Sequence, residues 1–196
     1  MQKVITIDCD DVLSETIDAL LKYYNYNIYW KKIYREDVAS HDFEKIKKYH
    51  YSFDERYYKD IDFFLHKDSL HLIKPLIWAK EKLLEFKEKW YKLYVITWRP
   101  DELKKHTLDR IDLNYHNLIE DVYFANADKD SAIPKSKFCE DLWSEFMVED
   151  DLRFARDIAS KWIKVYLLDK PWNQDYDEKD KDMGIVKIQS WDEIEA

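Results

Sequence analysis

Glycine is nearly absent from this chain of 196 residues, which contains only one, Gly184. An average usage of about 7% would give roughly fourteen. Glycine-rich phosphate loops of the Walker and dinucleotide-binding types need several glycines close together, so neither type can be present. Any phosphate chemistry in this protein must therefore use another kind of site.

Cysteine and long apolar runs are scarce as well. The two cysteines, Cys9 and Cys139, are too few for a disulfide framework or a zinc cluster, and we interpret both as reduced thiols. The chain reaches Asp8 before a signal-peptide core can form, and no apolar run approaches the roughly 18 residues of a membrane span. We expect a cytoplasmic protein that has no membrane partner.

Positive net charge is also missing, since 32 Lys and Arg stand against 41 Asp and Glu, a net charge of -9. Affinity for a polyphosphate backbone comes from neutralising Lys and Arg, so this balance argues against a nucleic acid polymer as partner. Hydrophobic residues make up 46% of the chain, enough for a buried core. The length favours one domain with a small insertion.

Short apolar runs, several rich in β-branched residues, alternate with segments of helical periodicity. The runs predict strands at 4–7, 93–96, 122–125, 146–148, 165–168 and 186–188. The periodic segments predict helices at 17–24, 77–88, 101–110, 135–143 and 152–161, and a turn at 191–194, whereas the acidic stretch 173–182 reads as a loop. This alternation predicts an α/β fold, a Rossmann-like parallel sheet flanked by helices.

The region from about Tyr23 to Leu72 has a different amino-acid composition. It is rich in Tyr, Lys, Trp and His and is interrupted by short polar stretches. Short amphipathic helices fit it better than strands. We therefore interpret residues 14–72 as a helical cap inserted after the first strand, and residues 1–13 and 73–196 as the α/β core.

Acidic and hydroxyl side chains follow the predicted strands where each strand ends. Asp8 and Asp10 follow the first strand, Thr97 the second, and 149–151 (Glu-Asp-Asp) a later one. Open α/β sheets bind ligands at this edge. Two close carboxylates repel each other unless a cation lies between them, and oxygen ligands suit Mg²⁺. The alternative is an acidic cluster that only caps helices, as on a flavodoxin-like binding domain without Mg²⁺ affinity.

A phosphate can be held here without glycine. Thr97 offers a hydroxyl at a strand end, and Lys135 and Lys137 stand at the start of a predicted helix. A helix N-terminus favours anions, and lysine can neutralise phosphate oxygens as charge moves. Arg99 is either a structural residue or a residue beside the phosphate. Cys9 has no basic neighbour in the sequence to lower its pKa, so we do not expect a nucleophilic thiol.

These segments together resemble the four motifs of the haloacid dehalogenase-like phosphatases. The stretch 8–13 (Asp-Cys-Asp-Asp-Val-Leu) resembles motif I, Thr97 motif II, Lys135 motif III and 149–150 motif IV. Within this family, the sequence is most similar to the 5'(3')-deoxyribonucleotidase group. Three further segments carry this similarity: 97–100 (Thr-Trp-Arg-Pro), 168–173 (Leu-Asp-Lys-Pro-Trp-Asn) and 190–194 (Ser-Trp-Asp-Glu-Ile).

The resemblance implies a Mg²⁺-dependent phosphomonoesterase acting on a small phosphate ester, with a nucleoside monophosphate as the expected substrate. It makes Asp8 the nucleophile that forms an aspartyl-phosphate, and also a metal ligand. Asp10 is then the general acid and base and gives the metal its backbone carbonyl. Thr97 hydrogen-bonds the phosphoryl group, Lys135 steadies Asp8 and the phosphate, and Asp150 completes the metal site, with Glu149 or Asp151 in support.

Three points depart from the motif pattern or leave it open. Asp11 stands where many members have glycine, although an Asp-Asp pair occurs in this branch. Lys135 and Lys137 compete for motif III, with Lys135 preferred, and motif IV can shift by one residue within 149–151.

Two other functions also stay open: a phosphatase of another small ester such as a sugar phosphate, and a phosphate-binding relative without turnover.

Overall fold

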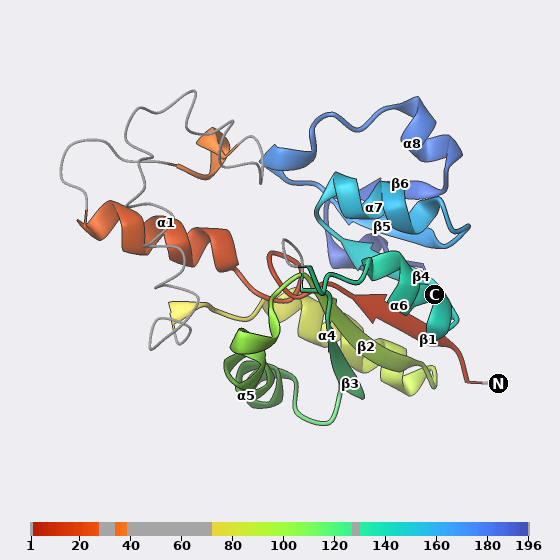
Figure 1. The fold of residues 1–196 in the computed structure, drawn as a ribbon, viewed down its shortest axis with the longest axis horizontal. Coiled ribbons are helices and arrows are strands. Elements are labelled where there is room, and N and C mark those ends of the chain that lie inside the picture. Colours follow the sequence, from red (N-terminus) through yellow and green to blue (C-terminus); the bar gives the residue numbers. More distant parts are fainter. Residues whose placement is uncertain (1, 28–33, 39–71, 127–129, 196) are drawn as a thin grey trace.

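Six short strands form a single parallel sheet in the order β3-β2-β1-β4-β5-β6 (Figure 1). The computed structural model describes residues 2–27, 34–38, 72–126 and 130–195. The strands are β1 (Val4–Ile7), β2 (Lys92–Thr97), β3 (Asp121–Phe124), β4 (Ser144–Glu149), β5 (Lys164–Leu168) and β6 (Ile185–Ile188). Every predicted strand is confirmed, and so is the Rossmann-like α/β class.

Helices connect the strands and cover both faces of the sheet. They are α1 (Thr16–Asn27), α4 (Ile77–Glu88), α5 (Lys104–Tyr115), α6 (Lys135–Asp141), α7 (Leu152–Ala159) and α8 (Glu178–Asp182). Single 3-10 turns lie at Arg35–Asp37, Asp101–Leu103, Pro171–Asn173 and Trp191–Glu193. The helix predicted at 101–110 thus begins as a 3-10 turn after Pro100 and continues to Tyr115.

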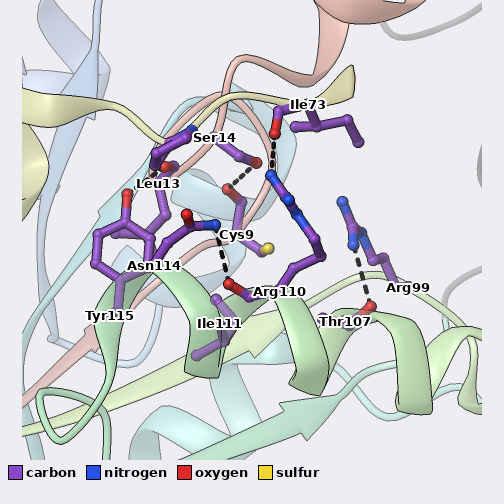
Figure 2. A pocket seen from close by; sticks show the side chains of 11 residues that line it. Cys9, Leu13, Ser14, Ile73, Arg99, Thr107, Arg110, Ile111, Asn114 and Tyr115 are labelled. Carbon is purple, nitrogen blue, oxygen red and sulfur yellow. Dashed lines mark hydrogen bonds between the residues drawn. The ribbon is translucent and has the colours of Figure 1, made fainter. Parts of the chain in front are cut away.

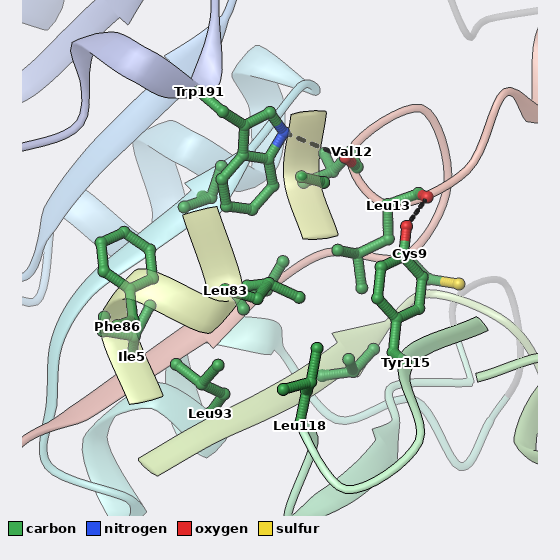
Figure 3. Packing of buried hydrophobic residues seen from close by; sticks show 14 of the residues in the cluster. Ile5, Cys9, Val12, Leu13, Leu83, Phe86, Leu93, Tyr115, Leu118 and Trp191 are labelled. Atoms are coloured by element: carbon green, nitrogen blue, oxygen red, sulfur yellow. Dashed lines mark hydrogen bonds between the residues drawn. The ribbon is translucent and has the colours of Figure 1, made fainter. Parts of the chain in front are cut away.

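The side chains of β1 alternate between two cores. Ile5 and Ile7 point to the face covered by α4 and α5, where Leu83, Phe86 and Trp191 complete the packing (Figure 3). Thr6 points to the opposite face and contacts Cys139 of α6. That second core is formed by α6, α7 and the strands beneath them. Because β1 is central and covered on both sides, its carboxyl end is held rigidly.

Helix α8 contradicts the prediction of a loop over 173–182. Asp177 accepts hydrogen bonds from the backbone of Lys179 and Asp180, at 2.8 and 3.3 Å. Asp180 in return accepts from the backbone of Asp177 at 3.0 Å and pairs with Arg156 of α7 at 2.6 Å. This reciprocal capping stabilises a single polar turn that has no apolar periodicity, which is why the sequence pattern missed it.

The chain ends several helices with a left-handed residue that is not glycine. Gly184, φ 93°, follows α8 in the usual way. Tryptophans take the same conformation after three other helices: Trp90 after α4, Trp143 after α6 and Trp162 after α7, with φ of 67°, 55° and 63°. All three are exposed, Trp162 to 97%. In this glycine-poor chain, tryptophans therefore take the left-handed backbone conformation that glycine usually takes after a helix.

Part of the predicted cap is described. Helix α1 begins it, and Ala19 and Leu20 pack against Ile73 and Leu103 in a small cluster apart from the two main cores. Residues 28–33 and 39–71, most of the predicted cap, lie outside the described residues, so the division into core and cap stays a prediction. Within the described part of the chain, no helix combines the length and apolar character needed to cross a bilayer.

Candidate active site

The strand register brings the predicted acidic residues together at the carboxyl edge of the sheet. Ile7 of β1 lies beside Val148 of β4, and the backbone N–H of Asp8 donates to the Val148 carbonyl at 2.9 Å. Asp8 and Glu149 thus leave two neighbouring strands side by side. Thr97 ends β2, on the other side of β1, and is fully buried.

Lys135 joins two of these carboxylates from the start of α6. Its Nζ lies 2.6 Å from Oδ1 of Asp8 and 2.7 Å from Oε2 of Glu149, and the lysine side chain has no exposed surface. Lys137, the competing candidate, is 57% exposed and pairs with Asp141 on the same helix. The geometry therefore places Lys135, and not Lys137, next to Asp8.

Three buried carboxylates form the centre of the site. Ligand oxygens of Asp8, Glu149 and Asp150 all lie within 4.8 Å of one another. Glu149 Oε1 also accepts from the backbone N–H groups of Asp150 and Asp151, both at 3.1 Å. Asp151 itself turns away to cap α7 and pair with Arg153. Of the three motif IV candidates, Glu149 and Asp150 face Asp8.

Burial dominates the electrostatics of this group. Removal from water raises the pKa of Asp8 to about 7, against the opposing effect of Lys135, and Asp150 and Asp10 add to the rise. The pKa of Glu149 is raised for the same reason. Burial alone would lower the pKa of Lys135, but Asp8 and Glu149 outweigh it and raise that pKa. Lys135 thus pairs with two of the three carboxylates, and the charge of Lys170 acts on Asp150 and Asp11. With Asp11 there are four buried carboxylates and two lysines, an excess of negative charge that favours a bound cation.

The carboxylate of Asp10 is not part of this group, because Arg99 holds it. Arg99 Nε and Nη2 donate to the two oxygens of Asp10 at 2.9 and 2.5 Å, and Thr16 donates at 2.5 Å. Burial works to raise the pKa of Asp10, but the charge and hydrogen bonds of Arg99 outweigh it and lower that pKa. The role of Arg99 left open by the sequence is settled in one respect: it contacts Asp10.

A small pocket lies behind this ion pair, between the β1 loop and α5 (Figure 2). Cys9, Arg99 and Thr107 line it, and Arg99 Nη1 donates to the Thr107 hydroxyl at 3.0 Å. The cavity measures about 20 Å³, enough to admit a water molecule. Burial raises the pKa of the Cys9 thiol to about 12, against the charge of Arg99, a basic neighbour in space that the sequence did not show.

Asp11 takes the left-handed conformation, φ 54°, which explains why glycine suits this position. Aspartate tolerates this region better than most residues. Its Oδ2 accepts from the backbone N–H of Ile17 at 3.0 Å, and Oδ1 lies 3.4 Å from the guanidinium of Arg35. Burial, with Asp150 nearby, raises the pKa of Asp11 to about 7. Asp11 therefore anchors the start of α1 beside the acidic centre.

The donor set fits a hard divalent cation. Carboxylate oxygens are the ligands that Mg²⁺ takes in proteins, usually from one or two carboxylates with waters and substrate oxygens completing the shell. Asp8 and Asp150 can supply such oxygens, while Glu149 is already occupied by Lys135 and two backbone N–H groups. The side chain of Asp10 is committed to Arg99, so this residue can contribute only its backbone carbonyl, as the motif resemblance implies.

The sequence matches no known protein family and no curated protein at a significant level. Solved structures do match over nearly the whole chain. A haloacid dehalogenase-like family hydrolase from Streptococcus pneumoniae has a TM-score of 0.67 at 11% identity, covering 95% of this chain and 93% of that one. A haloacid dehalogenase family hydrolase from Deinococcus radiodurans, with bound phosphate and sodium, has a TM-score of 0.66 at 10% identity, covering 96% and 91%.

A predicted phosphoglycolate phosphatase from Haemophilus somnus is also similar, with a TM-score of 0.63 at 16% identity over 94% of this chain and 93% of that one. Identities this low establish the fold alone. The chain has the haloacid dehalogenase-like fold. The resemblance first seen in four short motifs thus extends to the arrangement of the whole sheet.

Proposed function

We propose that this protein is a Mg²⁺-dependent phosphomonoesterase that works through an aspartyl-phosphate on Asp8. The observation that carries the proposal is the buried group in which Lys135 touches Asp8 and Glu149 while Asp150 stands beside them. These side chains come from three separate elements and meet at the edge of the sheet where α/β folds bind ligands. A similar structure described as a predicted phosphoglycolate phosphatase, and a similar hydrolase structure with bound phosphate, support the proposal.

The proposed reaction has two displacements at phosphorus. A carboxylate oxygen of Asp8 forms a bond to phosphorus while the bond to the ester oxygen breaks. Asp10 is ionised against Arg99 in this structure, so it must first take up a proton as that ion pair opens, and it then gives this proton to the departing alcohol. Water then attacks the same phosphorus, passes its proton to Asp10, and frees Asp8 and inorganic phosphate. In the ionised form of Asp10, Arg99 fixes the orientation of the carboxylate through two hydrogen bonds.

The remaining residues stabilise charge. The Lys135 ammonium can neutralise phosphoryl oxygens as negative charge develops on them, and the Thr97 hydroxyl can donate to one of them. Asp8, Asp150 and the carbonyl of Asp10 would hold Mg²⁺, which when bound supplies further positive charge to the phosphoryl group. In this reading, Glu149 is a support that fixes Lys135 and keeps it protonated.

We further propose that residues 14–72 form a cap that excludes water and selects the leaving group. The described part of this region already reaches the site. Arg35 pairs with Asp11 at 3.4 Å and with Asp18 at 2.7 Å, and Thr16 donates to Asp10. Residues of the proposed cap thus contact the loop that follows β1.

As substrate we propose a nucleoside monophosphate, supported by the similarity of segments 97–100, 168–173 and 190–194 to the deoxyribonucleotidase group. The competing substrate class is another small phosphate ester. The neighbour described as a phosphoglycolate phosphatase favours that class, because its substrate carries no base. Both classes share the chemistry at phosphorus and differ only in the leaving group.

A panel of phosphate esters tests the proposal. We expect Mg²⁺-dependent phosphate release from deoxy- and ribonucleoside monophosphates that is lost in Asp8→Asn and kept in Asp141→Asn, an exposed carboxylate on α6. Release only from sugar phosphates or phosphoglycolate would keep the mechanism and replace the substrate class. Unchanged metal-dependent release in Asp8→Asn would refute the mechanism. Mg²⁺ binding without turnover on any ester would identify a non-catalytic relative.

A further inference from the structure

Trp172 makes a contact that the proposed reaction does not use. It lies in the 3-10 turn Pro171–Asn173, directly after β5, and its side chain is buried, with 8% of the residue exposed. The indole Nε1–H donates to Oδ2 of Asp150 at 2.8 Å. A buried indole N–H needs an acceptor, and here the acceptor is a carboxylate of the acidic centre.

The same turn also holds the main chain of Asp150. The side-chain amide of Asn173, which is fully buried, donates to the carbonyl of Asp150 at 2.8 Å and to the carbonyl of Leu168 at 2.7 Å. One turn therefore ties the end of β5 to the end of β4. It restrains both the backbone and the carboxylate of Asp150.

The indole is itself held in place from the cap side. The guanidinium of Arg35 lies 5.1 Å from the centre of the Trp172 ring, within the range of a cation–π contact. Arg35 is fixed in turn by its pairs with Asp11 and Asp18. The rotamer of Trp172 is thus set on one side by Arg35 and on the other by Asp150.

We infer that Trp172 is a positioning residue of the metal site, which orients the Asp150 carboxylate before a cation binds. Hydrogen bonds to a ligating carboxylate from outside the ligand set fix its direction, and losing one typically costs 10- to 100-fold in metal affinity. The inference rests on the proposed function only in taking Asp150 as a metal ligand. Without the indole N–H, the carboxylate would have to be ordered on binding, at the expense of affinity.

The chain offers a matched control in Trp191. It too lies in a 3-10 turn, is buried with 3% exposed, and donates its indole N–H, but to the backbone carbonyl of Val12 at 3.3 Å. Trp172→Phe and Trp191→Phe each remove one indole N–H from a buried aromatic position. Only the first removes a hydrogen bond to the acidic centre.

The test is titration of the substrate-free protein with Mg²⁺ by calorimetry. We expect Trp172→Phe to raise the Mg²⁺ dissociation constant at least 10-fold, Trp191→Phe to leave it within about twofold, and Asp150→Asn to abolish binding. If Trp172→Phe does not fold, site-specific replacement of Trp172 by benzothienylalanine removes the N–H and keeps the ring shape. A Trp172→His variant, which restores a ring N–H, should recover part of the affinity.

The outcomes separate this inference from the proposed function. An unchanged dissociation constant in Trp172→Phe, with binding lost in Asp150→Asn, would overturn the positioning role and leave the metal site intact. Equal weakening by Trp172→Phe and Trp191→Phe would also overturn it, since both would then act through general packing. Full binding in Asp150→Asn would instead refute Asp150 as a ligand, and with it the proposed site.

Discussion

Lys135 is the single residue on which most of the buried charge at the site depends. It is the cation that touches both Asp8 and Glu149, and it is fully enclosed. A lysine in a buried position is retained in its charged form only by such partners, and here the two carboxylates raise its pKa. Its ammonium is therefore fixed where phosphoryl oxygens would arrive.

Replacing this lysine should remove catalysis more than binding. We expect Lys135→Met to lower kcat by roughly 10²- to 10³-fold, the usual loss when one preorganised donor to a developing charge is deleted. Lys137→Met is the control, because Lys137 is exposed and pairs only with Asp141. Steady-state kinetics on the best ester of the panel measures both. A large loss in Lys137→Met, with Lys135→Met unaffected, would reverse the assignment of motif III.

Residues at strand ends could be predicted from the sequence, and the motif resemblance added Lys135, but the contacts of Arg99 and Trp172 could not be predicted. Asp8, Thr97 and Glu149 each follow an apolar run that forms a strand. Because the carboxyl ends of parallel strands lie at the same edge of the sheet, these residues meet there regardless of the loop conformations. Arg99 contacts Asp10 over 89 positions of sequence, and Trp172 contacts Asp150 over 22. No periodicity links such pairs, because their contact is created by strand order alone.

At the scale of elements, the helix ends carry an unusual strain. A left-handed conformation costs an ordinary L-residue about 1–2 kcal/mol, and glycine avoids this at an entropic cost of about 0.5–1 kcal/mol. Trp162 has φ 63° and 97% of its surface is exposed. Its side chain therefore makes few packing contacts that could offset the cost of the left-handed conformation. The use of tryptophan instead of glycine after α7 therefore lowers the free energy of unfolding.

Two opposite substitutions test this reading. Trp162→Gly should raise the free energy of unfolding by about 0.5–1 kcal/mol, the difference between the two terms above. Gly184→Ala should lower the free energy of unfolding by a similar amount, because φ is 93° at this position and alanine is strained there. The new Cβ would meet no atom within 4 Å, so it would gain no packing contact to offset that strain. Urea unfolding of both variants measures the changes. Destabilisation by Trp162→Gly would mean that the tryptophan makes contacts worth more than its strain.

Strands and helices with apolar periodicity were predicted correctly, whereas the polar helix α8 was not. All six strands and α4 came from apolar runs or stripes, since burial against the sheet imposes the pattern. Helix α8 has the sequence Glu-Lys-Asp-Lys-Asp and is held by its cap and by Arg156. Such a helix depends on hydrogen bonds between specific side chains, which a hydropathy pattern does not record.

At the scale of the whole molecule, the acidic centre couples folding to pH and to metal. Burial raises the pKa of Asp8 and Asp11 to about 7 and also raises that of Glu149. Between about pH 4 and 7 the folded chain then holds protons that the unfolded chain has released. Stability from these groups is therefore fully present below about pH 4 and is lost as the pH rises through 7.

A bound cation should reverse this trend, because it binds the deprotonated carboxylates and only the folded state brings them together. At a Mg²⁺ concentration 100 times its dissociation constant, binding adds about 2.7 kcal/mol, which corresponds to a rise in Tm of roughly 5–10 °C for a domain of this size. We expect that rise near pH 8 and a much smaller one near pH 5. Thermal unfolding with and without Mg²⁺ across this range measures it.

Asp150→Asn separates a specific site from general screening of a chain with net charge -9. Screening by Mg²⁺ acts on all surface carboxylates, so it would survive in this variant, whereas the pH-dependent rise in Tm should disappear. The metal-free variant should also lose less stability between pH 5 and 8, because Asp150 is one of the charges that raise the pKa of Asp8 and Glu149. An equal Mg²⁺ effect in both proteins would place the cation elsewhere on the surface and leave the buried carboxylates to be balanced by protons and by cationic side chains such as Lys135 and Lys170.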